Sequence, residues 1–409
     1  MINKKPGKRF IGRAVLATAM LAAMSTPALA QDVKIGFLGG ITGPIAKPVV
    51  HIIKSIELAV KQVNDQGGIL GGRKLALVLA DSKCSPQNSV AAAGKLVNID
   101  NVSGIVGALC SSATIAAANA ATVPGGVVMI SPASTSPAIT GLKDKDFLFR
   151  TAPSDSFQGK ILAQAVLEQG IKKVALTYVN NDYGKGLADN FRAAYKAGGG
   201  TIAGDQAHED KKTSYRSELA TLARGGAKHL VMIAYPQSAA PIIIRQSLEG
   251  GLFKNFIGPE AFFDKALWKA IGVKNIEGAM YTRPASPAGP ANSAYNAAIK
   301  AYAPASAGQL FTGQSYDATF MLALAIQKAG STDRMKVKAA LRAVADGKGE
   351  KVLPGEWKKA VGLIKAGKEI DYSGATGVLD FDNNGDVAGS YDFFQIKGGK
   401  PAKLKHYAP

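Results

Sequence analysis

Residues 104–137 read GIVGALCSSATIAAANAATVPGGVVMISPASTSP. The two apolar runs in this stretch, 105–109 and 127–130, have the length and composition of strands buried in a parallel sheet. Each run ends in a cluster of hydroxyl side chains, at 111–112 after the first run and within 131–136 after the second. A helical segment is predicted after each cluster. The alternation of buried strand and helix predicts an α/β fold.

The hydroxyl clusters lie where an open α/β sheet binds its ligands. The C-terminal ends of parallel strands face the ligand crevice, and the helix N-termini there present free backbone N–H groups with a partial positive charge. The two clusters therefore suit a small anion such as a carboxylate, with Ser111 in the first cluster and Thr135 in the second as candidates to hold it. A pyrophosphate site would need a glycine-rich turn, which neither cluster has. Each hydroxyl taken singly is also explained as an ordinary helix N-cap, so that alternative stays open.

The same alternation of strands and helices extends along the chain in two series, so 409 residues suit two lobes rather than one compact domain. Three further helices follow the second series and need a sheet to cover, which predicts that the chain returns to the first lobe. The last part of the chain is predicted to form a hairpin of strands 378–381 and 391–396. The predicted N-terminal lobe is 31–152 and 284–376, and the predicted C-terminal lobe is 153–283 and 377–409. Three crossings between lobes make a hinge.

The first 30 residues have the organisation of a secretory signal peptide. Five basic residues occur before Ala14, and Asp32 is the first acidic residue. Residues 14–24 form an apolar segment too short to span a bilayer, and residues 28–30 are a small-residue cleavage site. We expect cleavage after Ala30 and export of the chain. A lipid anchor is not expected, because no cysteine lies near the cleavage site.

The net charge of the chain does not indicate a nucleic-acid partner. The formal net charge is +19, but lysines and arginines are scattered without a basic run, so nucleic acid is not an expected partner.

In an exported chain, Cys84 and Cys110 can form a disulfide. It would close a loop of about 26 residues and contribute roughly 3 kcal/mol on a chain-entropy model. Two cysteines without a nearby histidine do not complete a zinc site.

The familiar catalytic and metal-binding motifs are missing or incomplete. Residues 380–385 begin like a calcium loop, but position twelve of that loop is Tyr391 instead of an acid, so a turn is expected. Residues 313–317 lack the final glycine of a nucleophile elbow. The four histidines occur in unrelated contexts and supply no clear general base. We therefore expect neither an enzyme nor a bound metal or cofactor.

Loop residues of the second series complete a candidate site. Glu260 follows a predicted strand, Tyr183 and Tyr235 lie at the ends of two others, and Tyr316 begins a helix. Taken singly, each tyrosine can equally be a half-buried packing residue, and Glu260 can be a solvated loop acid. Together with the hydroxyl clusters they predict a site for a zwitterion. Ser111 and Thr135 would hold its carboxylate, and Glu260 its ammonium.

At this point the sequence resembles a known family, the periplasmic substrate-binding proteins of branched-chain amino-acid ABC transporters. The resemblance covers nearly the whole chain after the leader. The segments that carry it are 42–44 (TGP), 64–69 (NDQGGI), 107–112 (GALCSS), 131–135 (SPAST), 149–151 (FRT), 182–186 (DYGKG) and 258–260 (GPE).

The resemblance implies roles for individual residues. It assigns the ligand carboxylate to Ser111 and to the segment Ala133, Ser134 and Thr135, and the ammonium to Glu260. Tyr183, Tyr235 and Tyr316 match rings that wall the site, and Cys84 and Cys110 match the family disulfide. One position departs from the pattern, because Pro48 stands where the family often has an aromatic residue.

The resemblance also implies a fold and a mechanism. The fold would be a type I periplasmic binding protein, with two doubly wound α/β lobes joined by a three-segment hinge. An amino acid, branched-chain or otherwise aliphatic, would be captured between the closing lobes and delivered in the periplasm to an inner-membrane ABC permease by a monomer without cofactors. The alternatives are the same fold binding another small carboxylate such as an aromatic acid, the same fold acting as a ligand sensor, and an enzyme of the same compartment.

Overall fold

The computed structural model describes residues 1–4, 7, 31–346 and 348–408. The predicted leader, residues 1–30, lies outside the described residues except for positions 1–4 and 7. Residues 32–409 form one compact unit. Among the residues described, no helix combines the length and apolar composition that crossing a membrane requires.

The N-terminal lobe is built on a five-stranded parallel sheet in the order β2-β1-β3-β4-β5. This order places a topological switch point between β1 and β3, where an open sheet forms its ligand crevice. The strands are β1 (Val33–Gly39), β2 (Leu75–Asp81), β3 (Ile105–Gly107), β4 (Met129–Ser131) and β5 (Leu148–Arg150).

Helices cover both faces of this sheet. Alternate residues of β1 point to opposite faces, so Phe37 joins one buried cluster and Leu38 the other. The first cluster includes α1 (Ala46–Asp65) and α11 (Thr312–Ala329), and the second includes α2 (Pro86–Asn98) and α3 (Ser111–Ala117). All but three of the 18 residues of α11 are buried, so this helix runs through the core of the lobe.

The remaining elements of the N-terminal lobe are shorter. A π-helical turn (Ala118–Thr122) continues α3, and α4 (Pro137–Thr140) follows β4. The returning segment adds α10 (Pro290–Tyr302), a 3-10 turn (Pro304–Ser306), α12 (Arg334–Leu341), a 3-10 turn (Arg342–Val344) and α13 (Trp357–Lys365). It also adds a two-stranded parallel sheet of β11 (Glu350–Val352) and β12 (Ile370–Tyr372).

The C-terminal lobe has a seven-stranded sheet in the order β14-β13-β10-β9-β8-β6-β7. Its parallel part repeats the strand order of the first sheet and places a second switch point between β6 and β8. The strands are β6 (Lys173–Val179), β7 (Thr201–His208), β8 (His229–Ile233), β9 (Asn255–Gly258), β10 (Met280–Ala285), β13 (Ser390–Lys397) and β14 (Lys400–Tyr407).

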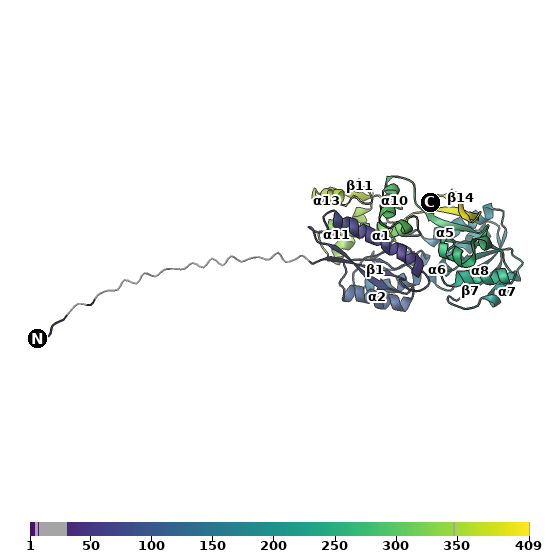
Figure 1. The fold of residues 1–409 in the computed structure, drawn as a ribbon, viewed down its shortest axis with the longest axis horizontal. Coiled ribbons are helices and arrows are strands. Elements are labelled where there is room, and N and C mark those ends of the chain that lie inside the picture. The colour runs from purple at the N-terminus through teal and green to yellow at the C-terminus, as the bar shows by residue number, and fades with distance from the viewer. Residues whose placement is uncertain (5–6, 8–30, 347, 409) are drawn as a thin grey trace. The chain divides into compact units, whose positions relative to one another are not determined.

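Helices again lie on both faces of the second sheet. The cluster that holds Leu176 includes α5 (Asp155–Glu168) and α6 (Asp182–Ala197). The opposite cluster, which holds Met232, includes α7 (Arg216–Ala223), α8 (Ala239–Glu249) and α9 (Lys265–Ile271). Two 3-10 turns, η2 (Glu260–Phe263) and η3 (Val273–Ile276), flank α9. Figure 1 shows α1, α2 and α11 grouped around the first sheet, and α6, α7 and α8 around the second.

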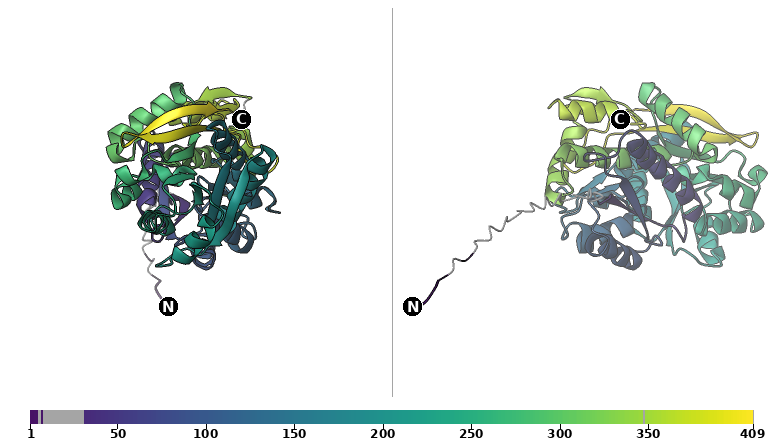
Figure 2. Two further views of the ribbon diagram at one scale, coloured as in Figure 1. Left: turned by 90° about the vertical axis from the view of Figure 1, so that its right-hand side faces the viewer. Right: turned by 60° about the vertical axis from the view of Figure 1, so that its left-hand side comes forward.

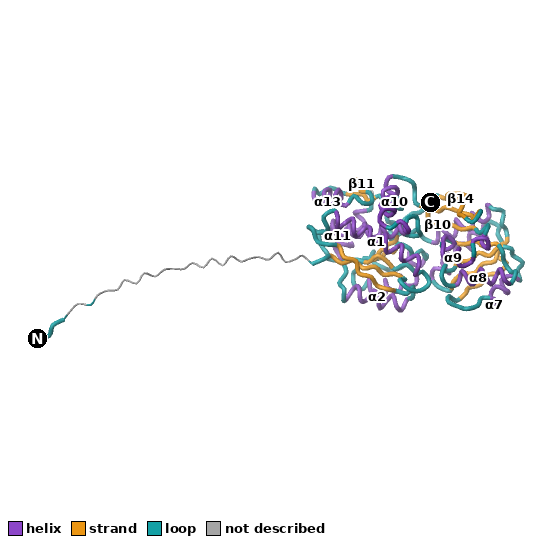
Figure 3. The backbone as a smooth tube through the Cα atoms, in the orientation of Figure 1, coloured by secondary structure: helices purple, strands orange, loops and turns teal. Residues whose placement is uncertain are grey.

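The chain passes between the two lobes three times. It leaves the first sheet after β5, returns after β10 to α10, and crosses again before β13. Figure 3 shows loops, drawn in teal, that join the two groups of strands. The predicted fold class is confirmed by this arrangement: two doubly wound α/β lobes joined by three crossing segments.

One predicted element is wrong. The C-terminal hairpin is formed by β13 and β14, drawn in yellow in Figure 2, and not by 378–381 and 391–396. Residues 378–381 form no strand, because Phe381 packs its ring 4.8 Å from that of Phe149 in the N-terminal lobe. The hairpin turn is at Gly398 and Gly399, whose φ angles of 57° and 73° suit glycine.

Candidate functional site

A pocket lies at the C-terminal ends of the strands of both sheets, at the two switch points. The space open to the centre of a water molecule is about 80 Å³. This is several times the roughly 10–15 Å³ that one water needs, so the pocket suits a small molecule. The N-terminal lobe supplies Ile45, Pro48, Val49, Ile52, Leu109, Cys110, Ser111, Ala133, Leu310 and Phe311, and the C-terminal lobe supplies Tyr183, Ala234, Tyr235, Pro236, Glu260 and Ala261.

Five of the eight predicted ligand-binding residues line this pocket. Ser111 and Ala133 come from the turns after β3 and β4, and Tyr183, Tyr235 and Glu260 come from strand ends of the other lobe. Ser111 is the first residue of α3, and its Oγ accepts a hydrogen bond of 3.2 Å from the Ser136 N–H. A hydroxyl group and a carboxyl group therefore enter the pocket from different lobes.

Ser134 and Thr135 are fully buried beside the pocket and do not belong to its lining among the described residues. The Ser134 hydroxyl is 2.6 Å from that of Thr114 and 3.2 Å from the Ala108 carbonyl oxygen. The Thr135 hydroxyl donates a bond of 2.9 Å to Asp155 Oδ2, and its carbonyl accepts one of 2.8 Å from the Asp155 N–H. Thr135 therefore links the turn after β4 to the first turn of α5.

Tyr316 also lies outside the pocket lining, within the part of the chain described, and its prediction as a wall residue is not supported by its position. The ring is buried in the N-terminal core and stacks on Phe320 at 5.6 Å. Its hydroxyl donates to Gln62 and accepts a bond of 2.9 Å from the Gly355 N–H. The aromatic wall position is occupied instead by Phe311, five residues earlier in the chain.

Phe311 was not found by sequence reasoning because its neighbourhood gives no strand or helix pattern. It has a left-handed backbone with φ of 57°, which is uncommon for a residue other than glycine. This conformation ends the loop that brings Leu310 and Phe311 to the pocket, directly before α11. The first turns of α1 supply a further part of the apolar wall, at Pro48, Val49 and Ile52.

The acidic end of the pocket is a buried carboxyl. Glu260 is 6% exposed and accepts a hydrogen bond of 2.7 Å from Gln158 Nε2. Burial raises the pKa of Glu260, although the bond from Gln158 opposes this shift. Gln158 Nε2 also donates to Thr282 Oγ1 at 3.1 Å, so the amide is held in place from two sides.

A second buried carboxyl, Asp155, lies behind Glu260 at the start of α5. Burial raises its pKa well above the usual range, and the nearby charge of Glu260 adds to this shift. Its Oδ1 atom and the Oε1 atom of Gln158 have no hydrogen-bond partner among the described residues. Two neighbouring carboxyls and a free amide oxygen make this end of the site rich in acceptors, and a cation would compensate them.

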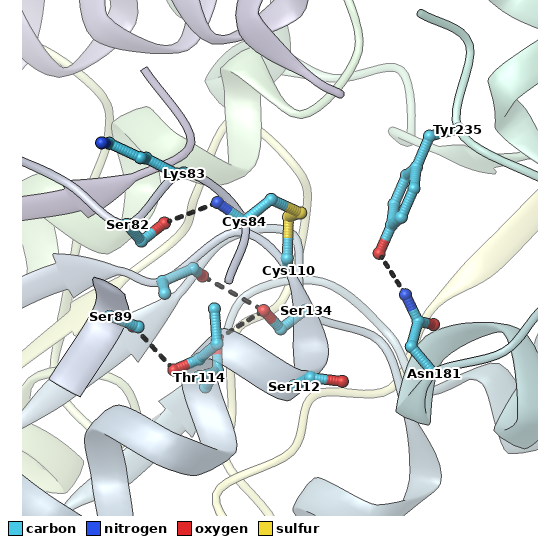
Figure 4. Close-up of a disulfide and its surroundings, with 12 residues drawn as sticks. Ser82, Lys83, Cys84, Ser89, Cys110, Ser112, Thr114, Ser134, Asn181 and Tyr235 are labelled. Atoms are coloured by element: carbon cyan, nitrogen blue, oxygen red, sulfur yellow. Dashed lines mark hydrogen bonds between the residues drawn. A yellow bond between two sulfur atoms is a disulfide. The ribbon is translucent and has the colours of Figure 1, made fainter. Parts of the chain in front are cut away.

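Two stacked tyrosines form the wall beside the acid. The ring centroids of Tyr183 and Tyr235 are 5.7 Å apart, with 24° between the planes. The Tyr235 hydroxyl accepts a bond of 3.1 Å from Asn181 Nδ2, and Asn181 in turn caps α6 by accepting from the Gly184 N–H. Burial raises the pKa of Tyr183, so its hydroxyl stays protonated. Figure 4 shows the bond between Tyr235 and Asn181.

The predicted disulfide is present in the structure. Cys84 and Cys110 are joined, with 5.4 Å between their Cα atoms (Figure 4). The bridge connects the segment after β2 to the end of β3, and Cys110 itself lines the pocket. The disulfide therefore holds one wall of the site to its neighbour in the same lobe.

Hydrogen bonds connect the lobes on both sides of the pocket. On one side, Ser112 Oγ donates to Asp182 Oδ2 at 2.5 Å, and Ser136 Oγ donates to the Asp182 carbonyl at 2.8 Å. On the other, the Lys47 N–H donates to Gln237 Oε1 at 2.9 Å. In the described part of the chain no group of three or more potential metal ligands gathers. The arrangement can enclose a small molecule between two lobes.

Comparisons with known proteins agree with this geometry. A family model described as "Periplasmic binding protein" matches residues 32–400. The Leu/Ile/Val-binding protein of Escherichia coli (strain K12) is 33% identical, covering 71% of this chain and 78% of that protein. The leucine-, isoleucine-, valine-, threonine- and alanine-binding protein of Pseudomonas aeruginosa is 31% identical, covering 83% of this chain and 90% of that protein.

A solved structure gives the same fold. It is the branched-chain amino acid transporter substrate-binding protein of Streptococcus pneumoniae, in complex with isoleucine. The TM-score is 0.77 and the sequence identity 25%, and the match covers 92% of this chain and all of the other.

Proposed function

Since the chain belongs to the periplasmic binding protein family, we propose that it captures an amino acid with an aliphatic side chain between its lobes and delivers it to an ABC permease. The relatives described above are named for binding leucine, isoleucine and valine, and one also for threonine and alanine. These names favour an amino acid over an aromatic acid. The family consists of binding proteins of transporters, so catalysis is not part of the proposal.

One observation carries the proposal: a buried glutamate, Glu260, and a serine, Ser111, line one largely apolar pocket from different lobes. Glu260 would pair with the ligand ammonium, and Ser111 would bind the carboxylate together with the turn at Ala133, Ser134 and Thr135. For Thr135 to bind the ligand, its hydroxyl would exchange the bond to Asp155 for one to the carboxylate. Val49, Ile52 and Phe311 would surround the side chain.

The mechanism follows from the division of the site between lobes. Ligand contacts from both lobes exist together only when the cleft is closed, so a bound amino acid shifts the population toward the closed form. The bonds of Asp182 and Gln237 across the cleft would add to that preference. We propose that a permease in the inner membrane recognises this closed form, that the protein acts in the periplasm, and that it does so as a monomer.

Thermal unfolding of ligand-stripped protein tests the proposal. At 100 times its dissociation constant a ligand adds about 2.7 kcal/mol to the free energy of unfolding. We expect leucine, isoleucine or valine to raise the melting temperature, and benzoate, which has no ammonium, to leave it unchanged. A rise with benzoate and none with any amino acid would contradict the proposal.

A further inference from the structure

A second cavity, the distal chamber, adjoins the ligand pocket. Its space open to the centre of a water molecule is about 490 Å³, compared with about 80 Å³ in the pocket itself. The two share five lining residues: Pro48, Pro236, Glu260, Ala261 and Leu310. Shared walls from both lobes make the chamber a continuation of the pocket, and none of the proposed head-group contacts needs it.

Two prolines are among the residues that line both the pocket and the chamber. Pro48 on the first turn of α1 and Pro236 after β8 lie on opposite lobes, and each lines both cavities. Neither proline can extend a side chain across the cleft. A ligand side chain that starts at the head group near Glu260 would enter the chamber past these two rings.

The acids that face the chamber are already engaged. Asp264 Oδ1 caps α9 by accepting from the N–H groups of Ala266, at 2.6 Å, and Leu267, at 2.9 Å. Its Oδ2 accepts a bond of 3.1 Å from Gln237 Nε2. Glu260 accepts from Gln158 and is reserved for the ligand ammonium under the proposed function.

The cations that face the chamber are not engaged. Lys47 and Lys265 line it from opposite lobes, and neither forms an ion pair within the described residues. His51 also lines it, with Nδ1 3.0 Å from Ser306 Oγ. Burial lowers the pKa of His51, so the uncharged ring offers a hydrogen bond at neutral pH. Lys47 and Lys265 are therefore the charged side chains of the chamber lining that have no partner within the described residues.

We propose that the distal chamber receives the far end of the ligand side chain, and that this end carries a negative charge paired with Lys47 and Lys265. The proposal rests on the proposed function, because the ammonium and carboxylate of the same ligand must occupy the pocket. The chemical class is an amino acid whose side chain is a linear aliphatic segment ending in an acid, bound in addition to the purely aliphatic amino acids of the proposed function. The apolar pocket wall would contact the segment, and the two lysines the acidic end.

Calorimetric titration of ligand-stripped protein with matched ligands tests the proposal. L-Norleucine and L-2-aminoadipate have side chains of equal length that differ only in a terminal methyl or carboxylate, and L-lysine has a similar length with the opposite charge. We expect 2-aminoadipate to bind at least as tightly as norleucine, and lysine to bind more weakly than both. Weaker binding of 2-aminoadipate than of norleucine would overturn the proposal, because a closed apolar end rejects an unpaired charge.

Substitutions of the two chamber lysines test whether the chamber accounts for the binding of 2-aminoadipate. The double variant Lys47→Ala, Lys265→Ala is expected to weaken 2-aminoadipate about tenfold, since one exposed ion pair contributes up to about fivefold. Norleucine should stay within twofold. The control is Lys269→Ala, which removes an exposed lysine of the same helix, α9, that does not line the chamber in the described structure. Equal effects of both changes on 2-aminoadipate would overturn the assignment.

Leucine binding distinguishes a failure of the chamber proposal from a failure of the proposed function. Leucine should bind whatever the chamber does, because its side chain fits the pocket alone. If leucine binds and 2-aminoadipate binds more weakly than norleucine, only the chamber proposal fails. If neither leucine nor any other of these amino acids binds, the proposed function fails and the chamber proposal fails with it.

Discussion

Glu260 is the residue on which the proposed charge pairing depends. It is buried, it lines the pocket, and burial raises its pKa, so an uncompensated charge there is costly. We predict that Glu260→Gln, which keeps the volume and removes the charge, weakens amino-acid binding by roughly two to three and a half decades. That range corresponds to the roughly 3–5 kcal/mol that breaking a buried pair costs.

Titration calorimetry of the folded variant measures this loss. Glu249→Gln is the control, because Glu249 is an exposed acid at the end of α8 and should leave the affinity unchanged. A Glu260→Gln protein that binds the same amino acid within about fivefold of the unchanged protein would falsify the assignment. That result would favour a ligand without an amino group.

The pH dependence of binding is a second prediction at the residue scale. In the empty pocket, burial raises the pKa of both Glu260 and Asp155, so each carboxyl takes up its proton at a higher pH than an exposed carboxyl does. A ligand ammonium favours the ionised forms and lowers the pKa again. Affinity should therefore be full above the raised pKa values and decrease as the pH falls through them.

Dissociation constants measured from about pH 4 to about pH 8 check this direction, because the midpoint of the loss should lie above the ordinary carboxyl pKa of about 4. Glu260→Gln should flatten the profile. An affinity that is constant, or that rises toward acid pH, would contradict the pairing of buried carboxyls with an ammonium.

The tyrosines show what sequence can predict about single residues. Tyr235 lies two residues after β8, and Tyr183 is the second residue of α6, four residues after β6, so both lie near strand ends that border the pocket. Tyr316 lies on a helix, where orientation depends on helical phase. Its i, i+4 partner Phe320 was a usable signal, because residues four apart share a face and both rings pack in the core. Phe311 had no such signal, since its position depends on a left-handed loop residue.

Among the elements, the strand–helix alternation was predicted well because buried parallel strands and amphipathic helices leave strong local patterns. Helix α13 and the short sheet of β11 and β12 were not predicted, since three-residue strands carry little periodicity. The hairpin error has a tertiary cause. The apolar residues Leu379, Phe381 and Val387 look like a strand flanked by a turn, but they pack in the core of the N-terminal lobe.

Arg150 joins three elements in the structure. Its guanidinium is fully buried at the end of β5, where Nε donates to Asp386 Oδ1 at 2.6 Å. It also donates to the Ser136 carbonyl at 2.9 Å and to Thr140 Oγ1 at 2.8 Å. The side chain thus connects the turn after β4, helix α4 and the segment that precedes β13.

We predict that Arg150→Ala lowers the free energy of unfolding by about 3–5 kcal/mol, because Asp386 would remain as a buried, uncompensated charge. Urea unfolding followed by circular dichroism measures the change. Arg216→Ala is the control, since its ion pair with Glu249 is exposed and is expected to contribute less than about 1 kcal/mol. A loss in Arg150→Ala no larger than in the control would show that the pair is not structural.

At the scale of the whole molecule, the sequence predicted the two lobes and three crossings, while the lobe boundaries remain predictions. The stretch 379–387 packs with β5, which favours a third crossing close to residue 389 over the predicted one at 377. Sequence alone could not place it, because a crossing segment has neither strand nor helix periodicity. The position of the crossing depends on which of the two lobes the side chains before and after it pack into.

Closure is the prediction for the whole molecule. We expect a saturating amino acid to reduce the radius of gyration in small-angle scattering, because the contacts from Ser112 and Lys47 across the cleft form only when the lobes meet. Circular dichroism should show unchanged secondary structure. Glu260→Gln protein at the same ligand concentration is the control and should stay open. An unchanged radius, with binding confirmed by calorimetry, would contradict hinge closure.

The origin of the pocket walls has a consequence for evolution. The charged and hydroxyl groups come from strand ends, whereas much of the apolar wall comes from two separate stretches, 45–52 and 310–311. Substitutions in those stretches can alter ligand preference while the anchoring of the head group is retained. After gene duplication, one copy can therefore evolve to bind a different ligand through a few codon changes in these stretches, while its head-group contacts stay the same.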